Sequence, residues 1–246
     1  MDASPADERL SQIATSWTLL IRAHELPPNH AAQARRALVE RYAGAVRRYL
    51  LGAVRDPELA CELFQEFALR VLDGGFRGAD RVKGRFRSYL KTALAHLIVD
   101  HRRRVGAAPV GLPQDLPAPA ALAEDDPDFT YAWRRELMDH AWAALKNAQP
   151  ALYEALLAHV RDPGLSSADA ASLLAQRLGR PCTAANARVI LHRGREKFVD
   201  LLVDEVERSL PGCSEQDVLD ELRELHLGRL CESAMRRRRA ARGSAA

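Results

Sequence analysis

The sequence predicts an all-α protein with two helical domains, a proline-rich linker between them and a helical tail. Three observations predict this fold. Alanine, leucine and arginine, which favour helices, are abundant, whereas only 6% of the 246 residues are aromatic. Apolar residues recur every three or four positions, and no alternating β pattern is longer than four residues. Residues 105–128 lack this periodicity and contain five prolines.

The first predicted domain, residues 1–104, holds four helices, including an additional helix at its N-terminus. Pro27 and Pro28 end this first helix. Asp56 and Pro57 signal the start of the third, because aspartate caps a helix and proline suits its first turn. The expected helices span about 9–25, 31–54, 57–72 and 86–104.

The second predicted domain, residues 129–206, follows the linker 105–128 and precedes a tail, residues 207–246. A flexible linker of this length would let two domains engage sites far apart. The tail is expected to form a helix near 214–235 with a basic end. It is either a regulatory appendage or a helix packed on the second domain. The expected helices of the second domain span about 131–145, 151–159, 167–178 and 184–206.

The charge is arranged in blocks that the net value of +3 conceals. Residues 76–104 hold nine basic and two acidic side chains, and residues 177–197 hold six and one. Only four of the 36 basic residues are lysine, and arginine offers a planar fork to phosphates and base edges. Two basic segments separated by acidic ones indicate two separate contacts with a polyanion.

Several classes of protein are excluded or disfavoured. No apolar run approaches a membrane span, and the acidic N-terminus does not resemble a signal peptide. The four cysteines lie far apart, which indicates reduced thiols in a cytoplasmic protein. A helical hydrolase would need more metal ligands than the neighbouring His96, Asp100 and His101 supply. We therefore expect no enzyme activity, no metal and no cofactor.

The first motif has the layout of a helix-turn-helix. Residues 167–178 are amphipathic and end at Gly179, and Thr183 can cap a second, cationic helix whose Ala187, Leu191 and Phe198 face inward. Asn186 suits adenine and Arg188 suits guanine, whereas the later cations suit phosphates. The alternative is a helical hairpin with a solvated basic face. The predicted DNA contacts are Thr183, Asn186, Arg188, His192, Arg193, Arg195 and Lys197.

The second motif interleaves aromatic and cationic residues over 76–104. Aromatic rings beside cations can hold unstacked bases on a strand whose phosphates are neutralised. For each aromatic residue, the alternative is a place in the core. The predicted single-strand contacts are Phe76, Arg85, Phe86, Arg87, Tyr89, Lys91, His96, Arg102 and Arg103.

The third motif is an acidic helix face. Glu62 and Glu66 lie four residues apart with Gln65 beside them, while Leu63, Phe67 and Val71 can face inward. An acidic face next to a basic segment suits a protein partner, and the alternative is an ordinary exposed helix face.

These residues resemble the extracytoplasmic-function (ECF) group of the sigma-70 family of bacterial transcription initiation factors. The runs Glu62–Phe67 and Phe86–Leu90, followed by Ala95, Asp100, Arg102 and Arg103, are similar to region 2 of the family. Leu191–Phe198 is similar to the end of the region 4 recognition helix. The resemblance covers about residues 30–104 and 140–203. It implies two helical domains and no catalytic activity.

The resemblance also implies partners and roles. Glu62, Leu63, Gln65 and Glu66 would bind the clamp helices of the RNA polymerase β′ subunit. The segment 73–96 would melt the −10 promoter element and hold one strand, and region 4 would read the −35 element and contact the β flap. An anti-sigma factor is a further partner that the family allows. The competing class is an operator-binding regulator that binds duplex DNA without polymerase.

Three residues depart from the family pattern. Tyr89 stands where tryptophan is usual but keeps a stacking face, His96 replaces an asparagine, and Ile190 replaces a common arginine. The last two departures concern which promoter sequence is read.

Overall fold

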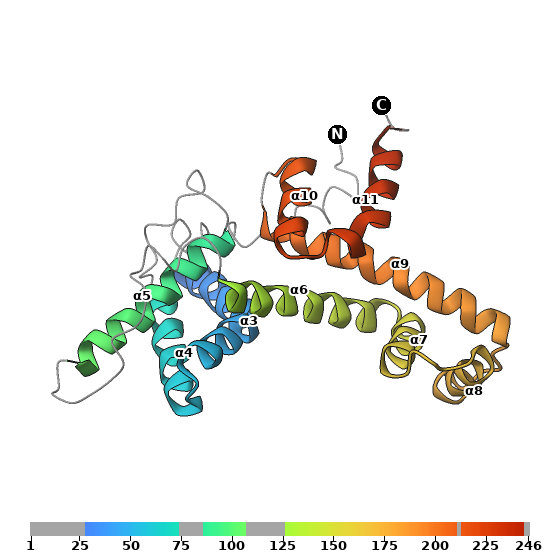
Figure 1. The fold of residues 1–246 in the computed structure, drawn as a ribbon, viewed down its shortest axis with the longest axis horizontal. Helices are drawn as coiled ribbons and strands as arrows, with labels where there is room; N and C mark the ends of the chain where they lie inside the picture. The colour runs from blue at the N-terminus through green and yellow to red at the C-terminus, as the bar shows by residue number, and fades with distance from the viewer. Residues whose placement is uncertain (1–27, 74–85, 107–125, 211–212, 244–246) are drawn as a thin grey trace. The chain divides into compact units, whose positions relative to one another are not determined.

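The computed structural model describes residues 28–73, 86–106, 126–210 and 213–243 (Figure 1). These residues form helices, with no strand among them, which confirms the all-α prediction. The predicted helix at 9–25 and most of the linker lie outside the described residues. The chain divides into two compact units, one of Met1–Glu136 with Glu207–Val218 and one of Leu137–Val206 with Leu219–Ala246.

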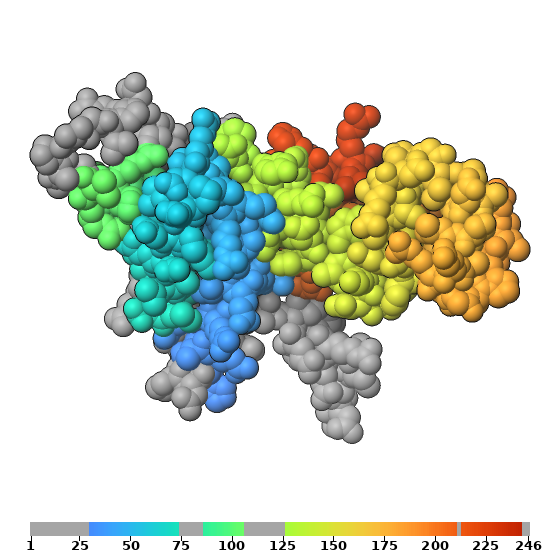
Figure 2. Space-filling view, turned by 90° about the horizontal axis from the view of Figure 1, so that it is seen from below, coloured from blue at the N-terminus to red at the C-terminus, as the bar shows by residue number. Residues whose placement is uncertain are grey.

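The first unit contains α3 (Pro28–Val54), α4 (Pro57–Leu72), α5 (Phe86–Gly106) and the first turns of α6 (Pro127–Ala148). α4 packs against both α3 and α5. Figure 2 shows α3 in blue and α4 in cyan lying side by side. The starts and ends of α3, α4 and α5 agree with the sequence-based ranges to within about three residues, because caps and helix breakers are local signals.

An aromatic cluster forms the core of the first unit. The indole of Trp133 on α6 is fully buried and stacks on Tyr42 of α3, with 5.0 Å between ring centroids. Phe86 of α5 lies 5.0 Å from Tyr42, and Phe129 of α6 lies 6.2 Å from Trp133. The predicted second domain begins at residue 129, and that boundary stays a prediction. The start of α6 nevertheless contributes its aromatic side chains to the core of the first unit.

The start of α6 differs from the prediction of a helix from residue 131. The Asp126 carboxylate accepts hydrogen bonds from the backbone N–H groups of Asp128 and Phe129, both at 3.1 Å. Pro127 occupies the first turn. This is the same aspartate–proline start signal that Asp56 and Pro57 give for α4, so the helix begins at residue 127.

The second unit contains the rest of α6, followed by α7 (Pro150–Arg161), α8 (Ser167–Leu178) and most of α9 (Ala184–Ser209). α7 packs against α8. α9 approaches α7 closely, since a Cβ added at Gly194 would lie 2.9 Å from the Leu152 carbonyl oxygen. Only glycine allows this spacing.

The tail forms two helices, α10 (Glu215–Glu224) and α11 (Gly228–Gly243), rather than the one helix predicted. His226 between them has φ 55°, and the Leu227 N–H donates to the Leu222 carbonyl at 2.8 Å, which closes the end of α10. Within the second unit, Arg237 of α11 pairs with Asp200 of α9 at 2.8 Å. Helix α11 is therefore packed against α9.

Candidate polymerase and nucleic-acid interface

Helix α4 presents an acidic face and buries the opposite one. Asp56 caps it by accepting hydrogen bonds from the N–H groups of Glu58 at 2.9 Å and Leu59 at 3.2 Å. Glu62 and Gln65 are exposed, as the predicted docking face requires. Leu63 is only 1% exposed, so its side chain lies in the core and offers no surface to a partner. Leu63 lies on the same face of α4 as Phe67 and Val71, which also point inward.

Glu66 is half-buried and is held by two arginines. Arg104 of α5 donates from Nη2 to Oε2 at 2.7 Å and to Oε1 at 2.9 Å, and Arg70 donates to Oε1 at 2.6 Å. Burial raises the pKa of Glu66, but the hydrogen bonds and charges of Arg104 and Arg70 together outweigh it, so the pKa lies below its ordinary value. The carboxylate stays ionised and fixed between α4 and α5.

Two predicted −10 contacts lie in the interior of the first unit. Phe86 is 1% exposed and packs on Tyr42, which corrects its assignment as a base-stacking residue. Lys91 is 8% exposed, so little of its side chain can meet a phosphate. Phe86 begins α5 on the face that meets α3. Phe76 and Arg85 lie outside the described residues.

The remaining predicted −10 contacts lie along α5. Tyr89, His96 and Arg103 are spaced by seven residues, so they share one side of the helix. His96 and Arg103 are exposed, while Arg87 and Arg102 are half-buried. Tyr89 is also half-buried, and burial raises its pKa to about 12, so its ring is neutral and partly accessible. This strip combines an aromatic face, an imidazole and a guanidinium.

The second unit contains a helix-turn-helix with the predicted caps. α8 is capped at its start by Ser166, whose Oγ accepts from the Asp169 N–H at 3.1 Å, and at its end by Gly179, whose φ of 64° is left-handed. Thr183 Oγ1 accepts from the Asn186 N–H at 3.2 Å and so caps α9. The Thr183 hydroxyl therefore stabilises the start of α9, and its contact with DNA stays a prediction.

The core of the helix-turn-helix explains one departure from the family pattern. Ala155, Ala171, Leu174 and Ala187 form a buried cluster from α7, α8 and α9. Ile190 is partly buried and packs against this cluster. An apolar residue therefore suits this position, where an arginine would place a charge beside the core.

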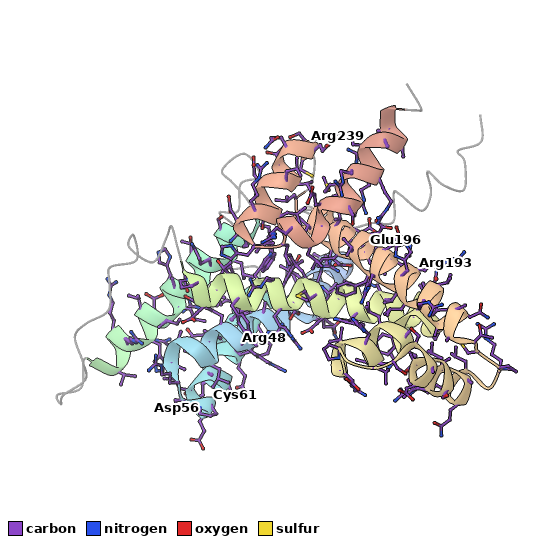
Figure 3. The ribbon with its side chains drawn as sticks, turned by 45° about the vertical axis from the view of Figure 1, so that its right-hand side comes forward. Arg48, Asp56, Cys61, Arg193, Glu196 and Arg239 are labelled. Carbon is purple, nitrogen blue, oxygen red and sulfur yellow. The ribbon has the colours of Figure 1, made fainter. Side chains whose placement is uncertain are left out.

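Most of the predicted −35 contacts are exposed on α9. The set comprises exposed Asn186, Arg188, His192, Arg193 and Arg195, together with half-buried Lys197. Figure 3 labels Arg193 and Glu196 on this helix. His192 lies 3.6 Å from the Glu196 carboxylate, and the Arg195 guanidinium lies 2.5 Å from the His159 ring. These two side chains have partners within their own unit.

The comparison with protein families decides the assignment of the first unit. Residues 38–107 match the family model Sigma-70 region 2. The chain contains a sigma-70 region 2. No curated protein and no solved structure matches the chain.

The matched residues include most of α3 and all of α4 and α5, and therefore the Glu66 network and the Tyr89–His96–Arg103 strip. The Sigma-70 region 2 match supports a role in promoter recognition and transcription initiation, with core RNA polymerase and promoter DNA as partners. The match ends at residue 107 and does not include the helix-turn-helix, which rests on the geometry of α8 and α9 alone.

None of the helices that the structure describes has the length and apolar character needed to cross a bilayer. Within the described ranges, no three His, Cys, Asp or Glu side chains come together as a metal site requires.

One contact of the site is not evident from the sequence, in which Arg104 forms part of a basic run. Arg104 instead contacts Glu66, 38 residues earlier. Helical periodicity carries no information about such a pair, because the two residues lie on different helices.

Proposed function

We propose that the protein is an ECF-type sigma factor whose second unit acts as region 4. Region 2 would bind the β′ clamp helices of core RNA polymerase and open the −10 element. The helix-turn-helix would read the −35 element and contact the β flap. The observation that carries the proposal is a helix-turn-helix with exposed Asn186 and Arg188 that follows a sigma-70 region 2 in the same chain.

The geometry of α9 supports base reading by its first turns. The N-terminal part of the second helix of a helix-turn-helix enters the major groove. Asn186 and Arg188 lie in the first two turns of α9, and both side chains are exposed. Asparagine pairs with adenine and arginine with guanine through two hydrogen bonds each. Arg193 lies further along α9 and suits a phosphate.

In region 2, the exposed residues support two different partners. Glu62 and Gln65 are exposed beside Glu66 and form an acidic surface suited to a protein. Tyr89, His96 and Arg103 form a strip suited to a single DNA strand, whose bases stack on aromatic rings and whose phosphates need cations. The two surfaces allow polymerase and DNA to be bound together.

Replacing Arg188 tests the region 4 assignment. The polymerase holoenzyme formed with Arg188→Ala should bind its promoter more weakly by about 1–3 kcal/mol and lose preference at one −35 base pair. Selection of promoters from a randomised −35 pool measures both effects. The control is Arg161→Ala, which removes an exposed arginine at the end of α7 rather than on the recognition helix.

Two outcomes would contradict the proposal. A uniform loss across all sequences would make Arg188 a phosphate contact. Tight binding of a duplex by the protein alone, with no binding of polymerase, would favour an operator-binding regulator instead.

A further inference from the structure

A large apolar side chain, that of Val189, stands on the solvent-facing side of α9. Val189 is 49% exposed, whereas Ala187, two residues earlier, is 2% exposed. Each residue of a helix turns by about 100°. Val189 therefore lies roughly opposite the stripe of Ala187, Gly194 and Phe198 that packs within the second unit.

The neighbours of Val189 on this surface are mostly polar. Asn186 precedes it by three residues, and His192 and Arg193 follow by three and four, so all three lie beside it on the helix. All three are exposed. A single exposed valine is ordinary on a protein surface. Its place at the centre of the face that a helix-turn-helix turns toward DNA is what makes it informative.

The major groove offers only one base with an apolar group. Guanine, adenine and cytosine present hydrogen-bonding atoms there, whereas thymine adds the C5-methyl group. A valine has no hydrogen-bonding atom in its side chain and can meet only this methyl favourably. We propose that Val189 contacts a thymine C5-methyl in the −35 element and creates a preference for thymine at that base pair.

This inference rests on the proposed function of the second unit and deepens it. Burying one methyl group away from water stabilises a complex by about 0.8 kcal/mol. By the relation between free energy and affinity, this corresponds to about a fourfold change in binding. The contact therefore changes the base preference at one position of the −35 element but contributes little to the overall affinity for the promoter.

Deoxyuridine provides a direct test, because it differs from thymidine only by the missing methyl group. The experiment uses holoenzyme formed with the full chain and a promoter selected from the randomised −35 pool. Each thymine of the −35 element is replaced by deoxyuridine in turn, and promoter binding is measured for the wild type and for Val189→Ala. Alanine is a better helix former than valine, so this variant should keep the fold of α9.

We expect one deoxyuridine substitution to weaken binding by the wild type about fourfold and to leave binding by Val189→Ala unchanged. Val160→Ala is the matched control, because Val160 is 57% exposed on α7 and should leave the wild-type response intact. Equal sensitivity of the wild type and Val189→Ala, or no sensitivity in the wild type, would overturn the inference alone. Selection of no −35 sequence at all would overturn the proposed function, and the inference with it.

Discussion

The Glu66 carboxylate on α4 accepts hydrogen bonds from Arg104 on α5, at 2.7 Å to Oε2 and 2.9 Å to Oε1. Arg70 completes the group by also pairing with Asp100, at 3.7 Å. Glu66, which is proposed to bind polymerase, therefore also links helices α4 and α5 of region 2. Its two roles can be separated by experiment.

Charge reversal at Glu66 should abolish binding to core polymerase. Glu66→Arg places a third cation beside Arg70 and Arg104 and removes the acidic group proposed to meet the β′ clamp helices. Co-purification with core polymerase measures the effect. The control is Glu40→Arg, since Glu40 is an exposed α3 residue that pairs with Arg36 at 3.0 Å. Full binding by Glu66→Arg would show that the docking face is misassigned.

Removing the arginine instead distinguishes docking from stability. Arg104→Gln breaks the pair with Glu66 but leaves the acidic group in place. Because an ion pair near the surface contributes about 1 kcal/mol or less, the fold should survive and polymerase binding should be kept. Loss of binding in this variant, with an intact fold, would mean that the position of Glu66 matters as much as its charge.

Acid should weaken the fold partly through Glu66. Its folded-state pKa lies below the ordinary value of 4.5, so the stability it contributes is complete above that value and is lost as pH falls through the folded-state pKa. The free energy of unfolding should therefore fall more between pH 6 and pH 3 (roughly) for the wild type than for Glu66→Gln. Urea unfolding at each pH measures the difference. Equal losses of unfolding free energy in the wild type and Glu66→Gln would show that Glu66 does not contribute to the acid sensitivity of the fold.

Gly44 and Gly52 on α3 form a matched pair for core packing. A Cβ at Gly44 would collide with the Glu136 carboxylate, which pairs with Arg48, whereas a Cβ at Gly52 would meet nothing within 4 Å. Figure 3 labels Arg48. Gly44→Ala forces the buried Glu136 carboxylate away from Arg48, so it should leave the protein less stable than Gly52→Ala by about 1 kcal/mol or more. Gly52→Ala should be neutral or stabilise it by up to about 1 kcal/mol, because alanine favours a helix.

The tail should be needed for stability. Leu225 is fully buried, whereas Leu230 is 45% exposed. Leu225→Ala should destabilise the protein by about 2–5 kcal/mol, since it leaves a cavity. Leu230→Ala should change stability by less than about 0.5 kcal/mol. Similar small effects in both would show that the tail is dispensable for the fold and would favour a purely regulatory role.

The sequence predicts the helices better than the faces they present. α8 has the predicted ends at Ser167 and Leu178, because a serine cap and a left-handed glycine are local signals. Asp126–Pro127 carries such a signal too, but it lies within the predicted linker 105–128, so α6 begins four residues before its predicted start.

The site was less predictable than the fold because its residues meet across helices. A basic and aromatic run predicts nucleic-acid binding, yet it does not separate the buried Phe86 from the accessible His96. The Leu63 side chain illustrates a different difficulty. Its family motif indicates a docking residue, whereas the helical spacing of apolar residues indicates a core residue. Leu63 is only 1% exposed, so the helical spacing gives the correct prediction.

Transcription by core RNA polymerase with and without the protein, from a pool of random promoters, tests the central claim most directly. A preceding pull-down establishes whether the purified full chain binds the core enzyme. The account predicts binding and new transcription start sites that share two promoter elements, one for each unit. Absence of polymerase binding, together with direct affinity for a duplex, would contradict it.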